Sequence, residues 1–585
     1  MGTISDKLMR VINTKEDIRQ ALISKGYDVP TSIPFKEYVK MILDLPCKAD
    51  SFPDIEGIVA RYSASGLTNE QMAANPVWVD KMGNGHDIQL KNFSWKGMSG
   101  VGGYEMNFNL WRNNVSSIPD ISMSTTTTSV SVSVGNSTYN NNLIYIHISN
   151  WDINKNHWLK VTSTYEDGDL AFVFYNDSNT KKIGLPANGY VNILAYPEFK
   201  GSYMYISTIS NKQGSFTIEQ LPLYPGALVF DGVDDYGVCD NFPILTKEKG
   251  YTVVALRQWI TRGKGALGLV SNVKNWLKDG AFLLEYRNIQ ADHLNKPISF
   301  GAIGSEMDLP HILTYQTSKS YNGVSITTGN FEGTDVLHVG KLAPTNVGTC
   351  INAAIWELVF LDHDATEEEL TKIKDYFVKT YPWLFPDQAW TVVGKTNEDE
   401  DRATIANIMG NGNDLVLSNF GFIEGSGYNE EGEYAGYLVT DGVDDKITSS
   451  AFKMGKDFTV VGEWKFLKDD VIKLAGFVKY DAFMFYNYSY NNRINIYIYS
   501  PQGVAFNNVD TIKAVTSEGQ VYFDFNSIKE VKPGDLADKG YVMNIGHNGS
   551  NHTKLALKNF AIYPTVLSKD DCIKAYNYLQ TLKSK

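Results

Sequence analysis

Most of this chain consists of short stretches in which apolar and polar residues alternate. Residues 129–134 read Ser-Val-Ser-Val-Ser-Val, and similar strand-like runs at 143–148, 170–175 and 190–196 are separated by clusters of Asn, Asp and Gly. A period of two places successive side chains on opposite faces of a strand, and the intervening clusters are typical of turns. The pattern predicts a mainly β protein whose short antiparallel strands pack as sandwiches.

Apolar residues at helical spacing occur at the N-terminus and at the end of each β-rich unit. Residues 1–49 contain three short amphipathic segments, which are too small to enclose a core alone. They either cap the next domain or attach the chain to a partner or to its own copies. Further on, Thr366 and Glu369 precede an apolar stripe that includes Ile373 and Phe377, which predicts a closing helix.

Four sequence markers occur twice in the same order, which indicates two copies of one domain. The marker Met-Gly-Asn-Gly recurs 327 residues later, whereas Asp-Gly-Val-Asp-Asp recurs only 210 residues later. The first copy therefore holds 117 extra residues between these two markers. The pairs that set this alignment include 82–87 with 409–414, 228–235 with 438–445, and 353–377 with 555–579.

These observations predict a division of the chain into four parts. We expect a helical module, a first sandwich interrupted by an inserted β-domain, and a second sandwich; each repeated sandwich is expected to be a jelly roll, because many strands precede one terminal helix. The predicted boundaries are 1–49 for the helical module, 50–108 plus 225–386 for the first sandwich, 109–224 for the insertion and 387–585 for the second sandwich.

Composition and charge exclude several classes of function. The chain of 585 residues has 53 Lys and Arg against 66 Asp and Glu, a net charge of −13, so we expect no nucleic acid as partner. No run of about 18 apolar residues occurs, so no membrane insertion is expected. The sequence lacks H-E-x-x-H, G-x-S-x-G and a phosphate-binding glycine loop, and we therefore expect a protein without enzymatic activity.

Each copy contains an Asp-Gly-Val-Asp-Asp segment, in which three carboxylates lie beside a glycine. Hard oxygen ligands at this spacing could hold Ca²⁺. The alternative is a tight turn in which Asp accepts backbone N–H groups and Gly adopts positive φ. The candidate metal ligands are Asp231, Asp234, Asp235, Asp441, Asp444 and Asp445.

The segment 483–499 of the second copy is a candidate ligand-binding hairpin. A two-residue turn at Asn491 and Asn492 would pair Tyr490 with Arg493. The alternation would place an aliphatic face in the core and a tyrosine-rich face outside. That outer face could stack on a glycan, contact another subunit or simply face solvent. Its candidate residues are Tyr486, Tyr488, Tyr490, Arg493, Asn495, Tyr497 and Tyr499.

The repeated units resemble laminin-G-like (concanavalin A-like) lectin domains. The resemblance rests on L-x-F-D-G-V-D-D-Y at 228–236, on A-x-I-W-E-L at 353–358 and on the helix that follows. The second copy departs from it at 557–560, which read Leu-Lys-Asn-Phe. The resemblance implies jelly-roll sandwiches, a sugar-binding role and Ca²⁺ as a possible cofactor.

The wider arrangement is similar to virion fibre proteins of phages that infect gut Bacteroidetes, including the crAss-like group. The segments that carry this resemblance are the helical module at 1–49, M-G-N-G-H-D at 82–87 and I-E-Q-L-P-L-Y-P-G-A at 218–227. This resemblance implies a head or tail fibre on the particle exterior, synthesised in the host cytoplasm. Its implied partners are other virion proteins bound through the N-terminal helices, copies of itself in a homotrimer, and host-surface glycan. A bacterial glycan-binding or glycan-degrading protein and a purely architectural virion part stay as alternatives.

Overall fold

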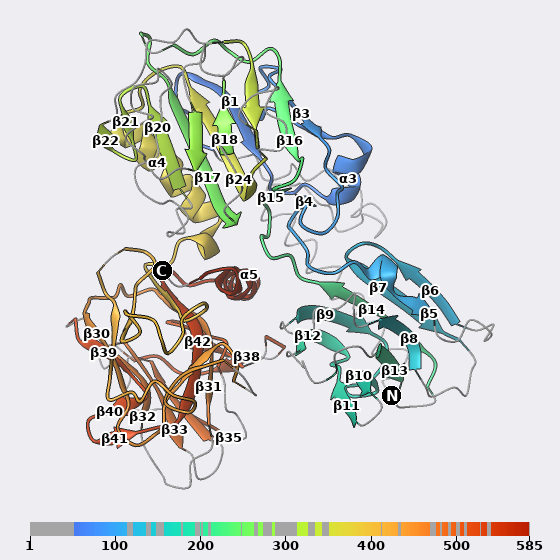
Figure 1. Cartoon of the computed structure of the whole chain (residues 1–585), viewed down its shortest axis with the longest axis vertical. Helices are drawn as coiled ribbons and strands as arrows, with labels where there is room; N and C mark the ends of the chain where they lie inside the picture. Colours follow the sequence, from blue (N-terminus) through green and yellow to red (C-terminus); the bar gives the residue numbers. More distant parts are fainter. Residues whose placement is uncertain are drawn as a thin grey trace, which may run out of the picture.

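The computed structural model describes three β-sandwiches (Figure 1). The helical module expected at 1–49 lies outside the described residues. Among the residues that are described, no helix has the length and apolar character needed to cross a membrane. The description covers 52–583 except 114–120, 136–141, 148–156, 177–178, 194–198, 200–202, 209–211, 247, 262–266, 273–282, 287–312, 326–333, 342–349, 411, 431–433, 468–474, 480–481, 489–492, 499–503, 508–511, 524, 527 and 535–539.

The first sandwich consists of two antiparallel sheets. One has the strand order β22-β21-β20-β17-β24-β15-β4, with β1 on the same edge of β24 as β15, and the other has the order β19-β18-β23-β16-β3-β2. The strands are β1 (Ile58–Ser63), β2 (Val77–Trp78), β3 (Ile88–Lys91), β4 (Gly100–Val101), β15 (Leu228–Asp231), β16 (Tyr236–Cys239), β17 (Thr252–Thr261), β18 (Leu267–Ser271), β19 (Leu283–Tyr286), β20 (Leu313–Thr317), β21 (Ser320–Tyr321), β22 (Val324–Ser325), β23 (Leu337–Val339) and β24 (Asn352–Leu361).

The second sandwich repeats this strand order. Its sheets run β38-β37-β36-β31-β42-β29-β28, with β25 beside β29 on β42, and β26-β27-β30-β39-β32-β33-β34-β35. Here β34 and β35 extend the second sheet. The strands are β25 (Gln388–Thr391), β26 (Thr404–Ile405), β27 (Leu415–Ser418), β28 (Gly427–Asn429), β29 (Tyr437–Val439), β30 (Lys446–Ala451), β31 (Thr459–Phe466), β32 (Ala475–Lys479), β33 (Phe483–Tyr488), β34 (Arg493–Ile498), β35 (Val504–Asn507), β36 (Ala514–Thr516), β37 (Gln520–Tyr522), β38 (Ile528–Glu530), β39 (Val542–Ile545) and β42 (Leu555–Tyr563).

The inserted sandwich occupies the connection between β4 and β15. Its own core extends from Met106 to Ile218 and separates two five-stranded antiparallel sheets, with the orders β11-β10-β13-β8-β5 and β12-β9-β14-β7-β6. The strands are β5 (Arg112–Asn113), β6 (Ile121–Thr125), β7 (Ser129–Val134), β8 (Asn142–His147), β9 (His157–Ser163), β10 (Leu170–Asn176), β11 (Asn179–Gly184), β12 (Asn188–Ile193), β13 (Tyr203–Thr208) and β14 (Gly214–Gln220). The predicted fold class, mainly β with two jelly-roll sandwiches and an inserted β-sandwich, is confirmed.

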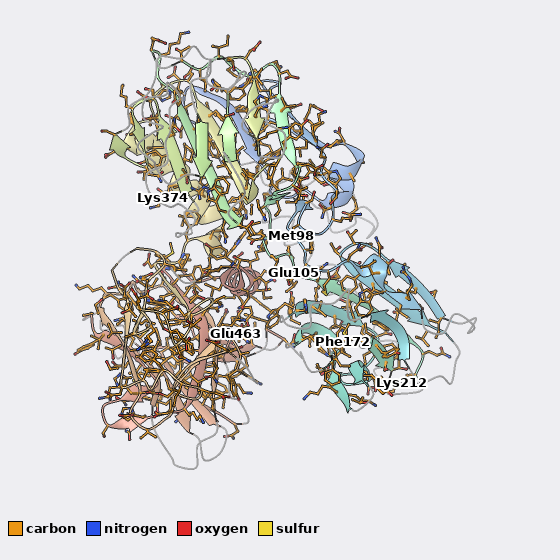
Figure 2. All side chains as sticks on the ribbon, in the orientation of Figure 1. Met98, Glu105, Phe172, Lys212, Lys374 and Glu463 are labelled. Carbon is orange, nitrogen blue, oxygen red and sulfur yellow. The ribbon has the colours of Figure 1, made fainter. Side chains whose placement is uncertain are left out.

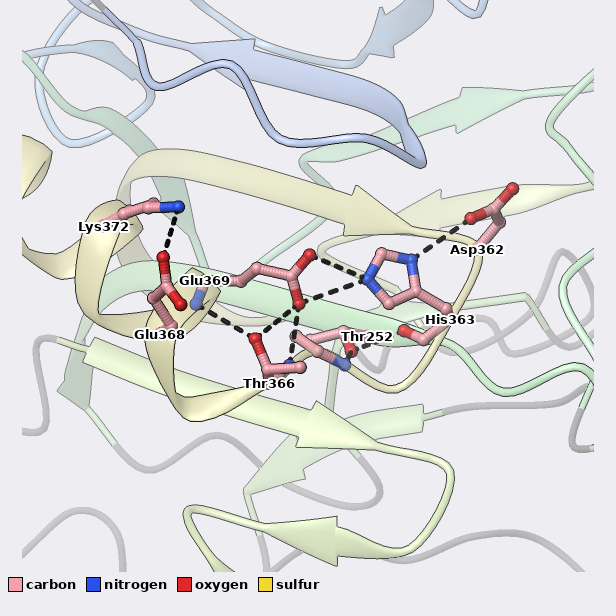
Figure 3. Close-up of polar contacts among 8 residues, drawn as sticks. Thr252, Asp362, His363, Thr366, Glu368, Glu369 and Lys372 are labelled. Atoms are coloured by element: carbon pink, nitrogen blue, oxygen red, sulfur yellow. Dashed lines mark hydrogen bonds and ion pairs between the residues drawn. The ribbon is translucent and has the colours of Figure 1, made fainter.

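Each repeated sandwich ends in a helix, and the local sequence explains where the first of these begins. In α4 (Glu367–Thr380) the Thr366 hydroxyl accepts from the N–H of Glu369, while the Glu369 carboxylate accepts from the N–H of Thr366 (Figure 3). This reciprocal capping satisfies two N–H groups that have no partner within the helix. His363 also contacts the Glu369 carboxylate, at 3.2 Å from Nε2 to Oε1, so the turn after β24 is tied to the helix start.

The helices α4 and α5 (Lys569–Gln580) join the two repeated sandwiches. One continuous apolar cluster contains Val254 and Trp356 of the first sandwich, Val461 and Ala561 of the second, and buried residues of both helices. The insertion contacts the same region, because the Trp158 ring of β9 lies 4.9 Å from the Tyr576 ring of α5. Helix α5 therefore lies where all three sandwiches meet (Figure 1).

Candidate ligand-binding face and metal loops

The predicted hairpin is present, but its register differs from the expected one. Tyr488 pairs with Arg493 and Tyr486 with Asn495, so four residues connect β33 to β34. The predicted two-residue turn, which paired Tyr490 with Arg493, is therefore wrong. A connection of four residues moves the pairing by two positions, and a shift of two leaves every side chain on its original face.

The division of the hairpin into two faces follows the alternation of the sequence. The side chains that face the core of the second sandwich are almost fully buried. Together with Trp464 and Phe477 they fill the space between the two sheets, which explains why this face is apolar. These residues are Phe483, Phe485, Ile494, Ile496 and Ile498.

The opposite face carries the candidate ligand-binding residues. Tyr486, Asn495 and Tyr497 are partly exposed there, and the rings of Tyr486 and Tyr497 meet edge to face with their centroids 5.7 Å apart. Tyr488 and Arg493 occupy the next pair of the ladder, although their side chains are outside the described part. The candidates Tyr490 and Tyr499 lie outside the described residues altogether.

A short second hairpin forms one side of this face. Strands β40 (His547–Asn548) and β41 (Asn551–His552) follow β39 and contact β32. The Asn548 side-chain amide donates to the Tyr486 hydroxyl at 3.3 Å. His547 Nε2 lies 3.0 Å from the Thr448 hydroxyl, and burial lowers the pKa of His547 to about 4, so the ring is neutral near pH 7. Sequence reasoning missed Asn548, because no local pattern shows that this hairpin lies against the sheet.

The two Asp-rich segments form the same hydrogen-bonded turn in both copies. Asp231 Oδ1 accepts from the N–H groups of Val233 and Asp234, at 2.7 and 3.3 Å, and Gly232 adopts φ +81°. Asp235 closes the turn, since its Oδ2 accepts from the Asp231 N–H and its Oδ1 from the Ser99 hydroxyl. In the second copy Asp441, Gly442, Val443, Asp444, Asp445 and Ser426 make the equivalent contacts.

These turns also bring three carboxylates together. One oxygen from each Asp of a triad lies within 4.8 Å of the others. Burial, reinforced by the charge of the neighbouring Asp231, raises the pKa of Asp235 to about 7, and in the second copy burial with the charge of Asp441 raises the pKa of Asp445 to about 6. The clustered negative charge is therefore unfavourable by itself. Each triad could bind a metal ion through oxygen ligands.

Two buried glutamates lie away from this face, between a sheet and a helix. Glu357 of β24 pairs with Arg61 and accepts from the Tyr381 hydroxyl at 2.7 Å. Glu463 of β31, labelled in Figure 2, accepts from the hydroxyls of Tyr437 and of Tyr576, which belongs to α5. Both carboxylates are held by hydrogen bonds in the protein interior, where they stabilise the packing of a helix on a sheet.

No protein-family model matches this chain, and neither does any curated protein. Among solved structures, the receptor-binding domain of botulinum neurotoxin D is similar at 10% identity over 32% of this chain, with a TM-score of 0.24. The type G receptor-binding domain is similar at 13% identity over 32%, with a TM-score of 0.20. The chain spans about half the length of these toxin domains, 50% and 49%. Trypanosoma rangeli sialidase in complex with sialic acid is similar at 8% identity over 79% of this chain and 83% of its own, with a TM-score of 0.24.

Proposed function

We propose that this chain is a non-enzymatic structural protein of a phage particle, a head or tail fibre whose second sandwich binds host-surface glycan. The observation that carries the binding role is the outer face of β33 and β34, where Tyr486, Asn495 and Tyr497 are partly exposed beside Asn548. Aromatic rings offer flat apolar surface to a sugar ring, and amide groups can donate to and accept from its hydroxyls.

We propose that the protein lies on the particle exterior. This location is supported by the resemblance of short segments of its sequence to fibre proteins. Residues 1–49 would attach it to other virion proteins, and association into a homotrimer would present several weak sites together. Several linked sites raise the overall affinity without any new contact. Glu357 and Glu463 are paired in the interior, so we do not propose them as a catalytic acid–base pair.

Alanine at both Tyr486 and Tyr497 is expected to lower glycan affinity at least tenfold, about 1.4 kcal/mol, because the stacking surface is lost. A glycan array would identify the bound sugar, and calorimetric titration with that sugar would measure the change. Tyr541→Ala is the matched control, since this tyrosine is 45% exposed elsewhere in the second sandwich. Unchanged affinity of the double variant, at an unchanged melting temperature, would exclude this face.

The virion assignment has a separate test. Mass spectrometry of purified particles should detect the protein, and antibody-gold labelling should locate it on the head or on the tail. Presence in cell lysate together with absence from particles would contradict the assignment. If the protein is present in particles in stoichiometric amounts but binds no glycan on an array, a purely architectural role in the virion would be favoured instead.

We further propose Ca²⁺ as the cation of the two Asp triads, because their ligands are hard carboxylate oxygens. Calorimetric titration with CaCl₂ should release or absorb heat and raise the melting temperature, since binding to the folded state alone stabilises it. Asp234→Asn together with Asp444→Asn should weaken both effects, and these two side chains are the exposed members of the triads. No heat and no shift in the melting temperature would leave the hydrogen-bonded turn as the sole role of these residues.

A further inference from the structure

One sheet of the inserted sandwich is cationic although the whole chain is acidic. Its strands β5, β8, β10, β11 and β13 contain Arg112, Lys181 and Lys182, and their sequences contain neither Asp nor Glu. The chain as a whole has a net charge of −13. Lys212, labelled in Figure 2, is 3.0 Å from both Glu166 and Asp169, which precede β10.

The strand register aligns these cations with tyrosines. Arg112 pairs with Tyr145, Tyr145 with Tyr205, Tyr205 with Val173, and Val173 with Lys182. This row crosses all five strands, and four strand spacings correspond to about 19 Å. A neighbouring row two residues further along β10 pairs Tyr175 with Tyr203 on one side and with Thr180 on the other. Both rows belong to one face, because residues i and i+2 of a strand share a face.

This face is the outer one. Phe172 and Phe174 alternate with the row positions and lie in the core of the insertion, so Val173 and Tyr175 point to the other side of the sheet. Lys182 is exposed, and Tyr175 is 49% exposed. The opposite sheet of the insertion contacts the second sandwich through Trp158 of β9. Since the outer faces of a two-layer sandwich point in opposite directions, the cationic face is turned away from that contact (Figure 1).

We propose that this outer face, formed by Arg112, Lys182, Tyr175 and Tyr205 and called here the cationic tyrosine face, binds an acidic polysaccharide, meaning a glycan chain that carries carboxylate or sulfate groups. The cations at the two ends of the row attract the anionic groups, and Tyr205 in the row and Tyr175 in the neighbouring row contact sugar rings. The surface is separate from the outer face of β33 and β34 and does not depend on the function proposed for it.

Charge density favours a polysaccharide over nucleic acid. Duplex DNA carries one negative charge for about every 1.7 Å of its axis, whereas the row offers one cation at each end of about 19 Å of sheet. The positions between the two cations are uncharged and include a tyrosine, so they suit the apolar face of a sugar ring better than a row of closely spaced phosphates.

The test compares the full chain with Arg112→Glu/Lys182→Glu and with Tyr175→Ala, using biolayer interferometry against alginate, heparin, dextran and oligo-dT. We expect alginate or heparin to bind, with an affinity that the double charge reversal lowers at least tenfold and that higher salt also weakens. Alginate binding alone would identify carboxylate as the recognised group, and heparin binding alone would identify sulfate. Tyr175→Ala should weaken the same interaction. Binding by charge attraction alone would not be affected by this variant, because the substitution changes no charge.

Two controls keep the proposal falsifiable. Lys529→Glu reverses an exposed charge on β38 of the second sandwich, and Tyr541→Ala removes an equally exposed tyrosine; both should leave affinity within twofold. The proposal is overturned if neither acidic glycan binds, if dextran binds as well as they do, or if oligo-dT binds more tightly. It is also overturned if the control variants lose as much affinity as the variants of the cationic tyrosine face.

Discussion

Tyr576→Ala is expected to destabilise the second sandwich by about 3–5 kcal/mol, the range typical of removing a buried aromatic ring. Tyr576 is 1% exposed, and its ring lies 4.9 Å from the ring of Trp158 and 5.8 Å from that of Phe525. Its hydroxyl donates to Glu463 at 2.8 Å and accepts from Lys513 Nζ at 3.0 Å. The Tyr576 side chain therefore contacts Phe525 and Glu463 of the second sandwich and Trp158 of the insertion.

The loss of the Tyr576 hydroxyl is part of this cost, because Glu463 is ionised in the interior. Burial alone would raise the pKa of Glu463, but the charges of Lys558 and Lys513 and the tyrosine hydroxyls lower it to about 2. A group with a lowered folded-state pKa stabilises the protein above its unfolded-state pKa, and this stability is lost as the pH falls towards 2. Removing a donor from this carboxylate reduces that contribution.

Chemical denaturation followed by circular dichroism would measure the effect of Tyr576→Ala. Tyr576→Phe is the matched control: it keeps the ring and should cost only about 1–3 kcal/mol, the range for leaving a buried polar partner unsatisfied. Hydrogen exchange should also become faster in β9, because the alanine variant no longer contacts Trp158. An unfolding midpoint equal to that of the wild type would contradict the role assigned to Tyr576.

Glu357→Gln is the second change for which we expect a large effect. It should lower the free energy of unfolding of the first sandwich by about 3–5 kcal/mol. Arg61 and Glu357 are 2% and 0% exposed, and the guanidinium donates to both carboxylate oxygens, at 3.1 and 3.2 Å. Arg61 also donates to the Tyr376 hydroxyl of α4 and lies over the Phe52 ring at 4.1 Å. Neutralising the glutamate leaves the arginine charge buried without its counter-charge.

The surface pair on α4 gives the control for this second prediction. Glu368 and Lys372 are 2.8 Å apart but largely exposed, so Glu368→Gln should cost no more than about 0.5 kcal/mol. The double variant Arg61→Met/Glu357→Leu should recover most of the lost stability, because it removes both charges and keeps apolar volume. Equal denaturation midpoints for Glu357→Gln and Glu368→Gln would show that the buried pair contributes nothing.

The candidate site shows what local patterns can and cannot predict. The alternation in 483–498 correctly predicted that Phe485 and Ile496 face the core and that Tyr486 and Tyr497 do not. The pairing partners were wrong, because Asn491-Asn492 is compatible with a two-residue turn whereas the folded sheet places four residues in the connection. Propensity at a turn is a weak constraint compared with the packing of two whole strands.

The sequence by itself determined which segments are strands, which of their faces are apolar and that one module occurs twice, because these properties follow from the local period of side chains and from repeated residues. Only the tertiary structure decided that Asn548 reaches Tyr486, that Trp158 of the insertion packs on Tyr576 of α5, and that Arg112 and Lys182 lie at opposite ends of one row. Such contacts join residues far apart in the chain, and they depend on strand register and on the docking of whole elements. No short stretch of sequence encodes either of these.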